Sequence, residues 1–420
     1  MTTDPLRPTP GQLAWQQDRM GVFFHFGINT FHGKEWSDGT LPASSFDPAE
    51  LDARQWVRAA QLAGAKYVVL TAKHHDGFCL WPTATTDYSV ASSPWQDGRG
   101  DVVAEVAQAC REAGLKFGLY LSPWDRNAAC YEDAAAYDAF YLAQLSELCT
   151  RYGTLHELWF DGAGSEGRVY DWARIGAVIA ELQPQAMVFN MGPATIRWVG
   201  NEDGLAEDPV EYVVSSTAVS NYVSDSETLD EEAYLPPECD VSLRPGWFWQ
   251  PAEEPKSLEH LLAIHYRSIG MGANLLLNLP PDSRGLIPDA DLARLAEFRA
   301  ELDRRFGKPM EARLTDLGDG EWELDFGREV LLDHVELGED LTEGQRVARH
   351  SILGKDGEVL AAGLTVGSQR LHAVVPHRAR RLRVQLNVDA ARLAFARAYD
   401  TGGAQVPVIE YTAPTHRPED

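Results

Sequence analysis

Strand-length apolar runs that alternate with helical segments constrain the fold of this 420-residue chain more than any other feature. The runs occupy residues 21–27, 66–72, 116–122, 157–162, 186–192 and 273–279, and amphipathic segments that end in glycine occupy 47–64, 101–114 and 136–153. Strands that are apolar on both faces are typical of a parallel sheet covered by helices. Because the runs extend over about 300 residues, and no GxGxxG motif follows the first run, the pattern predicts an α/β fold of the (β/α)8 barrel type rather than an open sheet.

The pattern changes after Pro309, where the helical periodicity nearly vanishes. Short segments of alternating hydrophobicity, such as 321–327, 330–338 and 381–388, are separated there by glycine and aspartate. Such a pattern is typical of an antiparallel, jelly-roll-like β-sandwich of about 100 residues. We therefore predict a barrel domain over residues 1–307 and a β-sandwich domain over residues 308–420.

The charge of the chain disfavours two classes of partner. The chain has 37 Lys and Arg residues and 63 Asp and Glu residues, so its formal net charge is −26 at pH 7. A surface this acidic repels nucleic-acid phosphates and anionic lipid headgroups, so we expect neither a nucleic acid nor a membrane as partner. No stretch approaches about 18 apolar residues, and the first twenty residues lack the pattern of a secretory signal, which favours a cytoplasmic protein.

Polar side chains stand at or just after the ends of the apolar runs, at the point where each predicted strand ends. His25, Tyr120 and Asp161 lie near the ends of the first, third and fourth runs, and His74 and His75 follow the second. Because the active site of such a barrel lies at the carboxyl ends of its strands, these side chains are expected to converge. The sequence therefore predicts a polar pocket that binds a hydroxyl-rich ligand.

Two carboxylates in this pattern indicate glycosyl transfer. Asp161 stands between an apolar strand and glycines that let a ligand approach closely, and Glu202 lies in the segment 191–237, which lacks a clear pattern and is expected to be a lid or binding loop. Hydrolysis of a glycosidic bond needs one carboxylate at the anomeric carbon and another that protonates the leaving oxygen. Glu238 competes with Glu202 for the second role.

Two other functions stay open on the residues alone. A metal-dependent hydrolase would use His74, His75 and Asp161, but adjacent side chains at a strand end diverge and no HExxH motif is present, so we expect no metal. A non-catalytic carbohydrate-binding protein on a degenerate barrel would need the aromatic residues and histidines but not both carboxylates.

Six motifs occur in an order that resembles the α-L-fucosidases of glycoside hydrolase family 29: FFHFGINTFHGKEW, KHHDGFCLWPT, GLYLSPWDR, LWFDGAG, RWVGNEDG and ECDVSLRPGWFW. The resemblance extends from about residue 15 to about residue 306. It implies a barrel enzyme that needs no cofactor or metal. It also implies a fucosylated oligosaccharide as substrate, retention of configuration through a covalent glycosyl-enzyme, and Asp161 as the nucleophile.

The resemblance further implies the residues that hold the sugar. RWVGNEDG resembles the branch that removes terminal α1,3- or α1,4-linked fucose from oligosaccharides or glycoconjugates, in which Glu202 is the acid/base; in the other branch that role would fall near Glu238. The substrate-binding residues that the resemblance implies are His25, Glu35, Trp36, His74, His75, Tyr120, Glu238, Arg244 and Trp247.

The C-terminal domain contributes none of these motifs. Because no motif follows Pro309, we expect the sandwich to support the barrel rather than take part in the chemistry.

Overall fold

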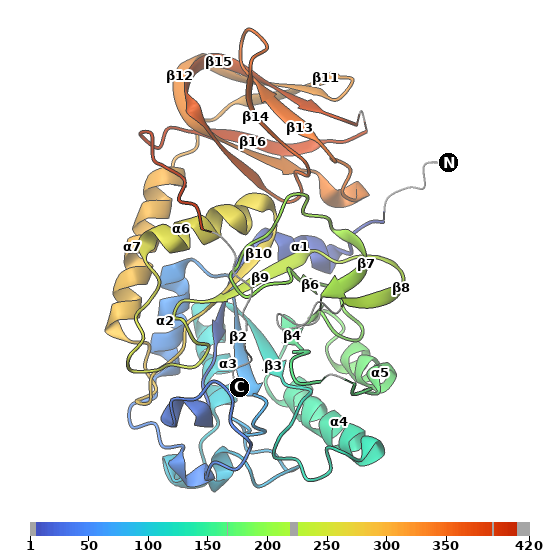
Figure 1. Ribbon diagram of the computed structural model, residues 1–420, viewed down its shortest axis with the longest axis vertical. Coiled ribbons are helices and arrows are strands. Elements are labelled where there is room, and N and C mark those ends of the chain that lie inside the picture. The colour runs from blue at the N-terminus through green and yellow to red at the C-terminus, as the bar shows by residue number, and fades with distance from the viewer. Residues whose placement is uncertain (1–5, 166, 219–225, 389, 410–420) are drawn as a thin grey trace.

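The computed structural model describes residues 6–165, 167–218, 226–388 and 390–409 and contains a barrel of eight parallel strands (Figure 1). The strands follow one another around the sheet in the order β5, β4, β3, β2, β1, β10, β9, β6. This arrangement confirms the predicted barrel. The barrel strands are β1 (Met20–Phe24), β2 (Tyr67–Lys73), β3 (Lys116–Leu121), β4 (Glu157–Trp159), β5 (Met187–Phe189), β6 (Arg197–Trp198), β9 (Pro237–Ser242) and β10 (Asn274–Asn278).

The sheet closes between its two edge strands, β5 and β6. Phe189 pairs with Ile196 in a parallel bridge, and the N–H of Asn190 donates to the carbonyl of Ile196 at 3.0 Å. On the other side of β6, the N–H of Val199 donates to the carbonyl of Glu238 in β9 at 3.0 Å. A closed ring of strands brings all eight carboxyl ends to one rim.

Several helices begin at a capping aspartate, and those over 53–63, 102–113 and 134–151 form where the sequence predicts amphipathic helical segments. The helices are α1 (Pro10–Asp18), α2 (Ala53–Ala63), α3 (Val102–Ala113), α4 (Ala134–Arg151), α5 (Trp172–Leu182), α6 (Leu258–Arg267) and α7 (Asp289–Phe306). An aspartate precedes each of α2 to α5 and accepts a hydrogen bond from the backbone N–H three residues further on. Each such cap stabilises its helix by about 1 kcal/mol. No helix in the described residues is long and apolar enough to cross a membrane.

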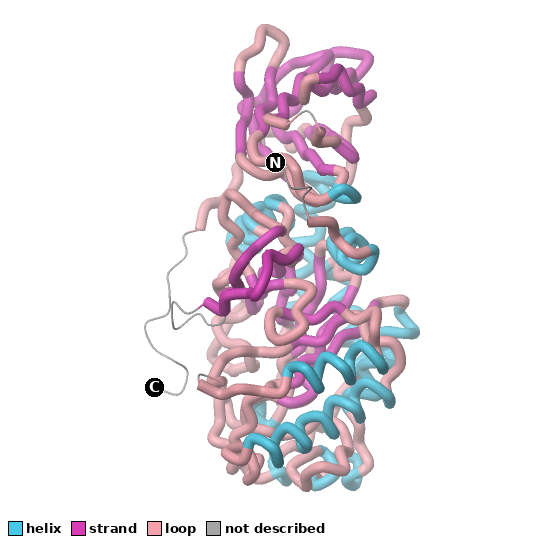
Figure 2. Tube along the Cα trace, turned by 90° about the vertical axis from the view of Figure 1, so that its right-hand side faces the viewer, coloured by secondary structure: helices cyan, strands magenta, loops and turns pink. Residues whose placement is uncertain are grey.

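The segment 191–237 differs from the loop that the sequence predicts. It contains the barrel strand β6 and a hairpin of β7 (Val213–Ala218) and β8 (Ser226–Tyr234), which stands where most of the other barrel units have a helix. The prediction missed these strands because β6 has only two residues and β7 exposes polar side chains. Figure 2 shows strands and loops, rather than helices, where this hairpin lies.

The C-terminal domain is antiparallel, as predicted, and has its own core. Its strands are β11 (Arg313–Gly318), β12 (Glu321–Glu339), β13 (His350–Leu353), β14 (Val359–Gly363), β15 (Arg370–Leu386) and β16 (Leu393–Tyr399). The two long strands, β12 and β15, pair along most of their length and shift register twice. The predicted boundary near Lys308 lies between the end of α7 and the start of β11.

Gly21 in β1 allows the aromatic ring of Tyr67 to pack inside the barrel, because a Cβ atom at this position would lie 2.3 Å from that ring. We expect Gly21→Ala to lower the stability of the chain by about 1–3 kcal/mol, since the crowded interior must shift. Gly176 in α5 has no contact closer than 3.4 Å at its Cβ position, so Gly176→Ala should keep or raise the stability. Thermal unfolding of both variants tests this difference. Equal unfolding midpoints for the two variants would contradict it.

Candidate active site

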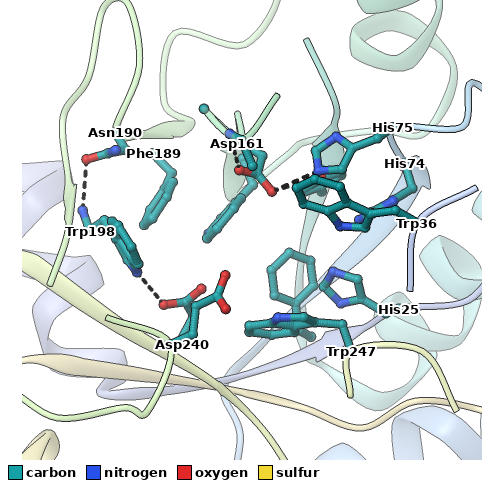
Figure 3. A pocket seen from close by; sticks show the side chains of 16 residues that line it. His25, Trp36, His74, His75, Asp161, Phe189, Asn190, Trp198, Asp240 and Trp247 are labelled. Carbon is teal, nitrogen blue, oxygen red and sulfur yellow. Dashed lines mark hydrogen bonds and ion pairs between the residues drawn. The ribbon is translucent and has the colours of Figure 1, made fainter. Parts of the chain in front are cut away.

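A pocket opens at the carboxyl ends of the barrel strands (Figure 3). The structure brings together there most of the side chains that the sequence singles out. Those that line the pocket are His25, Trp36, His74, His75, Tyr120, Asp161, Glu202 and Trp247. The other three, Glu35, Glu238 and Arg244, do not belong to its lining.

Asp161 follows β4 and extends into the pocket, with about a quarter of its side chain exposed. The hydroxyl of Tyr120 donates to its Oδ2 at 3.1 Å, and the N–H of Ala163 donates to its Oδ1 at 2.9 Å. Burial raises the pKa of Asp161 to about 6, against the hydrogen bonds from these two donors. The carboxyl group is therefore ionised at pH 7, and its direction is fixed from both sides.

The hydrogen-bond partners of His75 determine its tautomer. Ser122 Oγ donates its single hydrogen to the carbonyl of Trp124 at 2.6 Å, so it accepts from His75 Nδ1 at 2.7 Å. Burial lowers the pKa of His75 to about 3, so the ring is neutral and its Nε2 carries a lone pair. This atom lies 3.6 Å from Asp161 Oδ2. Two acceptors thus face each other, and a hydroxyl group placed beside both can donate to one of them.

His25 has the same tautomer. Asn278 Nδ2 donates to the carbonyl of Trp247 at 2.8 Å, which leaves Asn278 Oδ1 to accept from His25 Nδ1 at 3.0 Å. Burial lowers the pKa of His25 to about 3 and that of His74 well below its usual value. His74 stacks on Tyr120, and its Nδ1 has no hydrogen-bond partner within the part of the chain that the structure describes. The pocket therefore presents uncharged imidazoles, which suit hydroxyl groups rather than anions.

Aromatic rings form the remaining walls of the pocket. Trp159 and Phe189 stack at 3.8 Å between ring centroids, and Phe23 packs edge to face on Trp159 at 5.2 Å. Such rings offer flat apolar surfaces to the C–H faces of a ligand. The rings that line the pocket, besides Tyr120, are those of Phe23, Trp36, Trp159, Phe189, Trp198 and Trp247.

Glu202 lines the pocket from the turn that follows β6. Asn201 organises this turn: its Nδ2 donates to the carbonyl of Leu205 at 2.7 Å, and its Oδ1 accepts from the N–H groups of Asp203 and Leu205. Asp203 also bridges to Val241 in β9. The glutamate therefore stands on an ordered turn held against the barrel.

Asp240 is a pocket residue that the sequence analysis missed. It is almost fully buried in β9, and Trp198 Nε1 donates to its Oδ1 at 2.6 Å. Burial and the nearby charge of Glu202 raise its pKa well above the usual range. Figure 3 shows Asp161 and Asp240 on opposite walls of the pocket. The two walls of the pocket thus both carry carboxyl groups.

Strand alternation could have identified two further pocket residues. Phe23 stands two residues before His25, and Trp159 stands two residues before Asp161, so each pair lies on one face of its strand. The sequence marks both aromatic residues only as parts of apolar runs. The same rule applied to the predicted site residues would have assigned Phe23 and Trp159 to the pocket.

Glu35 and Arg244 lie behind the wall that carries Trp247. Glu35 Oε2 accepts from the N–H groups of Trp247 at 2.8 Å and Phe248 at 3.4 Å, and burial raises its pKa to about 6. Arg244 forms a buried, bidentate ion pair with Asp291 of α7 at 2.9 and 2.6 Å. Both residues therefore fix the loop that presents the indole.

Glu238 lies fully buried inside the barrel. The hydroxyl of Tyr67 donates to its Oε1 at 2.5 Å, and Trp159 Nε1 donates to its Oε2 at 3.0 Å. Burial raises the pKa values of Glu238 and of neighbouring Glu157, which accepts from Trp15 Nε1. Glu238 thus anchors the underside of an aromatic pocket residue, Trp159.

Taken together, the pocket combines uncharged hydrogen-bond acceptors, aromatic walls and carboxyl groups on two sides. Within the described ranges, no group of three or more His, Cys, Asp or Glu side chains is arranged to hold a metal ion. A polyhydroxylated ring fits these surfaces, and carboxyl groups on two sides of it can attack and protonate.

The raised pKa of Asp161 makes the stability of the protein depend on pH. Because the pKa is about 6 in the folded state and 3.8 in the reference state, protonation favours folding, and this contribution is lost as the pH rises through 6. Asparagine does not titrate, so Asp161→Asn avoids this loss. We therefore expect the free energy of unfolding of Asp161→Asn, taken relative to the wild type, to be about 1.4 kcal/mol higher at pH 7.5 than at pH 5. Urea unfolding at both pH values measures the difference.

The control for this measurement is Phe189→Leu, which alters the same pocket without changing a titrating group. Its stability relative to the wild type should be the same at both pH values. A difference between Asp161→Asn and the wild type that does not change with pH would contradict the raised pKa.

Several known proteins are similar to this chain in sequence. A family model described as alpha-L-fucosidase matches residues 1–304. Alpha-L-fucosidase 1 of Arabidopsis thaliana is 40% identical over 415 residues, covering 87% of this chain and 82% of the relative. Human plasma alpha-L-fucosidase is 25% identical over 317 residues, covering 65% and 64%.

Solved structures share the fold over nearly the whole chain. SpGH29 superposes with a TM-score of 0.86 at 35% identity, covering 95% of this chain and 99% of that one. A Ruminococcus gnavus fucosidase of glycoside hydrolase family 29, solved in complex with fucose, gives a TM-score of 0.82 at 28% identity and covers 95% and 96%. Because the family model spans the whole barrel, and a relative at 40% identity covers most of the chain, this chain belongs to the alpha-L-fucosidase family of glycoside hydrolases.

Proposed function

We propose that this glycoside hydrolase is a retaining exo-α-L-fucosidase in which Asp161 is the nucleophile and Glu202 the acid/base. The observation that carries the proposal is the pair of carboxyl groups at the rim of one pocket, Asp161 after β4 and Glu202 after β6. The uncharged imidazoles and aromatic rings between them support a sugar as the ligand. The fucose bound to the Ruminococcus gnavus relative supports fucose in particular.

The proposed reaction proceeds in two steps. Ionised Asp161 attacks the anomeric carbon, while protonated Glu202 gives its proton to the glycosidic oxygen and the leaving group departs. In the second step Glu202 takes a proton from water, whose oxygen attacks the anomeric carbon and releases Asp161. The pKa of about 6 supports the role of Asp161, because most of this carboxyl group is ionised at pH 7 while it keeps more basicity than an exposed aspartate.

The geometry also supports roles for the histidines in substrate binding. His25 and His75 keep their hydrogen on Nδ1, so each offers Nε2 as an acceptor to a ring hydroxyl of fucose. The stacked rings of Trp159 and Phe189 provide an apolar surface for the C6 methyl group. The sugar is thus recognised by acceptors on one side and by aromatic surface on another.

The proposed substrate is a terminal α1,3- or α1,4-linked fucose on an oligosaccharide or glycoconjugate. The linkage follows from the assignment of Glu202, because the RWVGNEDG motif resembles the branch with that preference. Residues from β6, β9 and the turn after β6 form the wall opposite Asp161, where the leaving group would lie. The choice between Glu202 and Glu238 therefore also decides the predicted linkage.

Replacement of each glutamate by alanine tests this assignment. An aryl fucoside with a good leaving group needs little protonation, whereas an α1,3-fucosyl-N-acetylglucosamine needs an acid. We expect Glu202→Ala to slow cleavage of the disaccharide by about 10²–10⁴-fold and that of the aryl fucoside far less. Glu238→Ala removes the carboxylate that accepts from Tyr67 and Trp159, so it should lower the rates of cleavage of both substrates by similar factors.

Steady-state values of kcat/KM for both substrates, measured for both variants, show which glutamate is the acid. Added azide should accelerate the aryl substrate in Glu202→Ala and yield the α-fucosyl azide, because it attacks the covalent intermediate from the face opposite Asp161. If Glu238→Ala shows the leaving-group contrast and Glu202→Ala does not, the acid assignment and the linkage preference both fall. Family membership would stand in that case.

A further inference from the structure

A short segment after the Glu202 turn is bonded to the C-terminal domain. We call this segment, residues 208–212, the tether. Arg370 at the start of β15 donates to both carboxylate oxygens of Asp208, at 3.1 and 2.6 Å, and the N–H of Leu364 donates to Asp208 Oδ2 at 3.1 Å. Arg370 is buried, so this bidentate ion pair lies at the interface rather than in solvent.

The middle of the tether is held by paired hydrogen bonds. The N–H of Val210 donates to Thr365 Oγ1 at 3.0 Å, and Gln345 Nε2 donates to the carbonyl of Val210 at 2.9 Å. The N–H of Tyr212 donates to Gln345 Oε1, also at 2.9 Å. Backbone and side chains of the C-terminal domain therefore hold this segment along its length.

Tyr212 connects three parts of the molecule. Its hydroxyl donates to the carbonyl of Gly272, just before β10 of the barrel, at 2.6 Å and accepts from the N–H of Ser368 at 2.9 Å. A Cβ atom at Gly272 or Gly367 would lie 2.8 or 2.3 Å from this hydroxyl oxygen, so both positions must be small. β7 then starts at Val213, directly after the buried tyrosine.

Two pocket segments adjoin the tether. The turn with Glu202 precedes it, and β7 follows it and ends at Ala218, whose carbonyl accepts from Asn190 Nδ2 at 2.7 Å. Asn190 lines the pocket and accepts from the N–H of Trp198 at 3.0 Å. Figure 3 shows Asn190 and Trp198 on the wall away from the histidines. The tether therefore lies between the two segments that border the leaving-group side.

We infer that the C-terminal domain positions the leaving-group side of the active site through the ion pair of Arg370 with Asp208; this inference rests on the proposed role of Glu202. Arg370 is a positioning residue, which acts through the tether on the Glu202 turn and on β7. The hydrogen-bond partners of His25 and His75 are barrel residues, Asn278 and Ser122, so binding of fucose itself does not depend on this interface.

The size of the effect follows from the other anchors of the turn. The N–H of Ala206 donates to the carbonyl of Arg267 at 2.7 Å, and Asp203 bridges to Val241, so the barrel also restrains the turn. Loss of Arg370 should therefore misplace the acid slightly rather than release it. A small misplacement of a catalytic group costs on the order of 10-fold in rate.

The test compares Arg370→Gln with Arg381→Gln. Arg381 lies on the same strand, β15, and forms a 2.9 Å ion pair with Asp325, which is not part of the tether. We expect Arg370→Gln to lower kcat/KM for α1,3-fucosyl-N-acetylglucosamine by about 10-fold. Its kcat/KM for an aryl fucoside and its inhibition constant for free fucose should stay within about 2-fold of the wild type. Arg381→Gln should change none of these values.

Arg370→Lys should recover part of the disaccharide rate, because lysine keeps the charge but not the bidentate geometry. If Arg370→Gln does not fold, Thr365→Ala and Tyr212→Phe provide the same comparison. The first removes the acceptor of the Val210 N–H, and the second removes the hydrogen bonds of the tyrosine hydroxyl to Gly272 and Ser368. Equal loss on both substrates, or no loss on either, in folded variants overturns the inference. Glu202→Ala is assayed in parallel to separate this inference from the proposed function. If Glu202→Ala does not slow the disaccharide more than the aryl fucoside, Glu202 is not the acid. If Glu202→Ala shows this contrast and the tether variants do not, Glu202 remains the acid and only the positioning role of Arg370 is wrong.

Discussion

Closure of the parallel sheet is the constraint on which the rest of this structure depends. Two of the eight barrel units have no helix among the residues that the structure describes, and one strand has only two residues. The ring is nevertheless completed by the bridge from Phe189 to Ile196 and the pairing of β6 with β9. Because the ring is closed, the carboxyl ends of β4, β6 and β9 face one another across one opening. Carboxyl groups about 40 residues or more apart in sequence thereby share a pocket.

The apolar runs predict β1 to β5 and β10, and the amphipathic segments predict α2, α3 and α4, because these features depend on local patterns. β6 escapes prediction because its place in the ring comes from backbone pairing rather than from an apolar run. Alternation places Glu238 and Asp240 on the same face of β9, but their depth depends on how the strands are staggered around the barrel. Only the structure shows that Asp240 lines the pocket and Glu238 lies among the buried aromatic residues.

Tertiary partners account for the other differences between the predicted site and the pocket. The motifs that contain Arg244 and Glu35 predict that both bind the sugar. In the structure Arg244 donates to Asp291, and Glu35 accepts from the backbone of the Trp247 loop. Asp291 lies in a helix with no sequence signal that links it to Arg244. Such pairs support the residues that line the pocket, and they depend on contacts between segments that are distant in the sequence.

The central claim is that Asp161 forms a covalent bond to the sugar, and trapping that bond tests it most directly. The protein would be incubated with 2-deoxy-2-fluoro-fucosyl fluoride, whose fluorine at C2 slows breakdown of the intermediate, and then digested for mass spectrometry. The account predicts one fluorofucosyl group per chain, located on the peptide that contains Asp161. A label on another carboxyl group, or complete turnover with inversion at the anomeric carbon and no label, would contradict it.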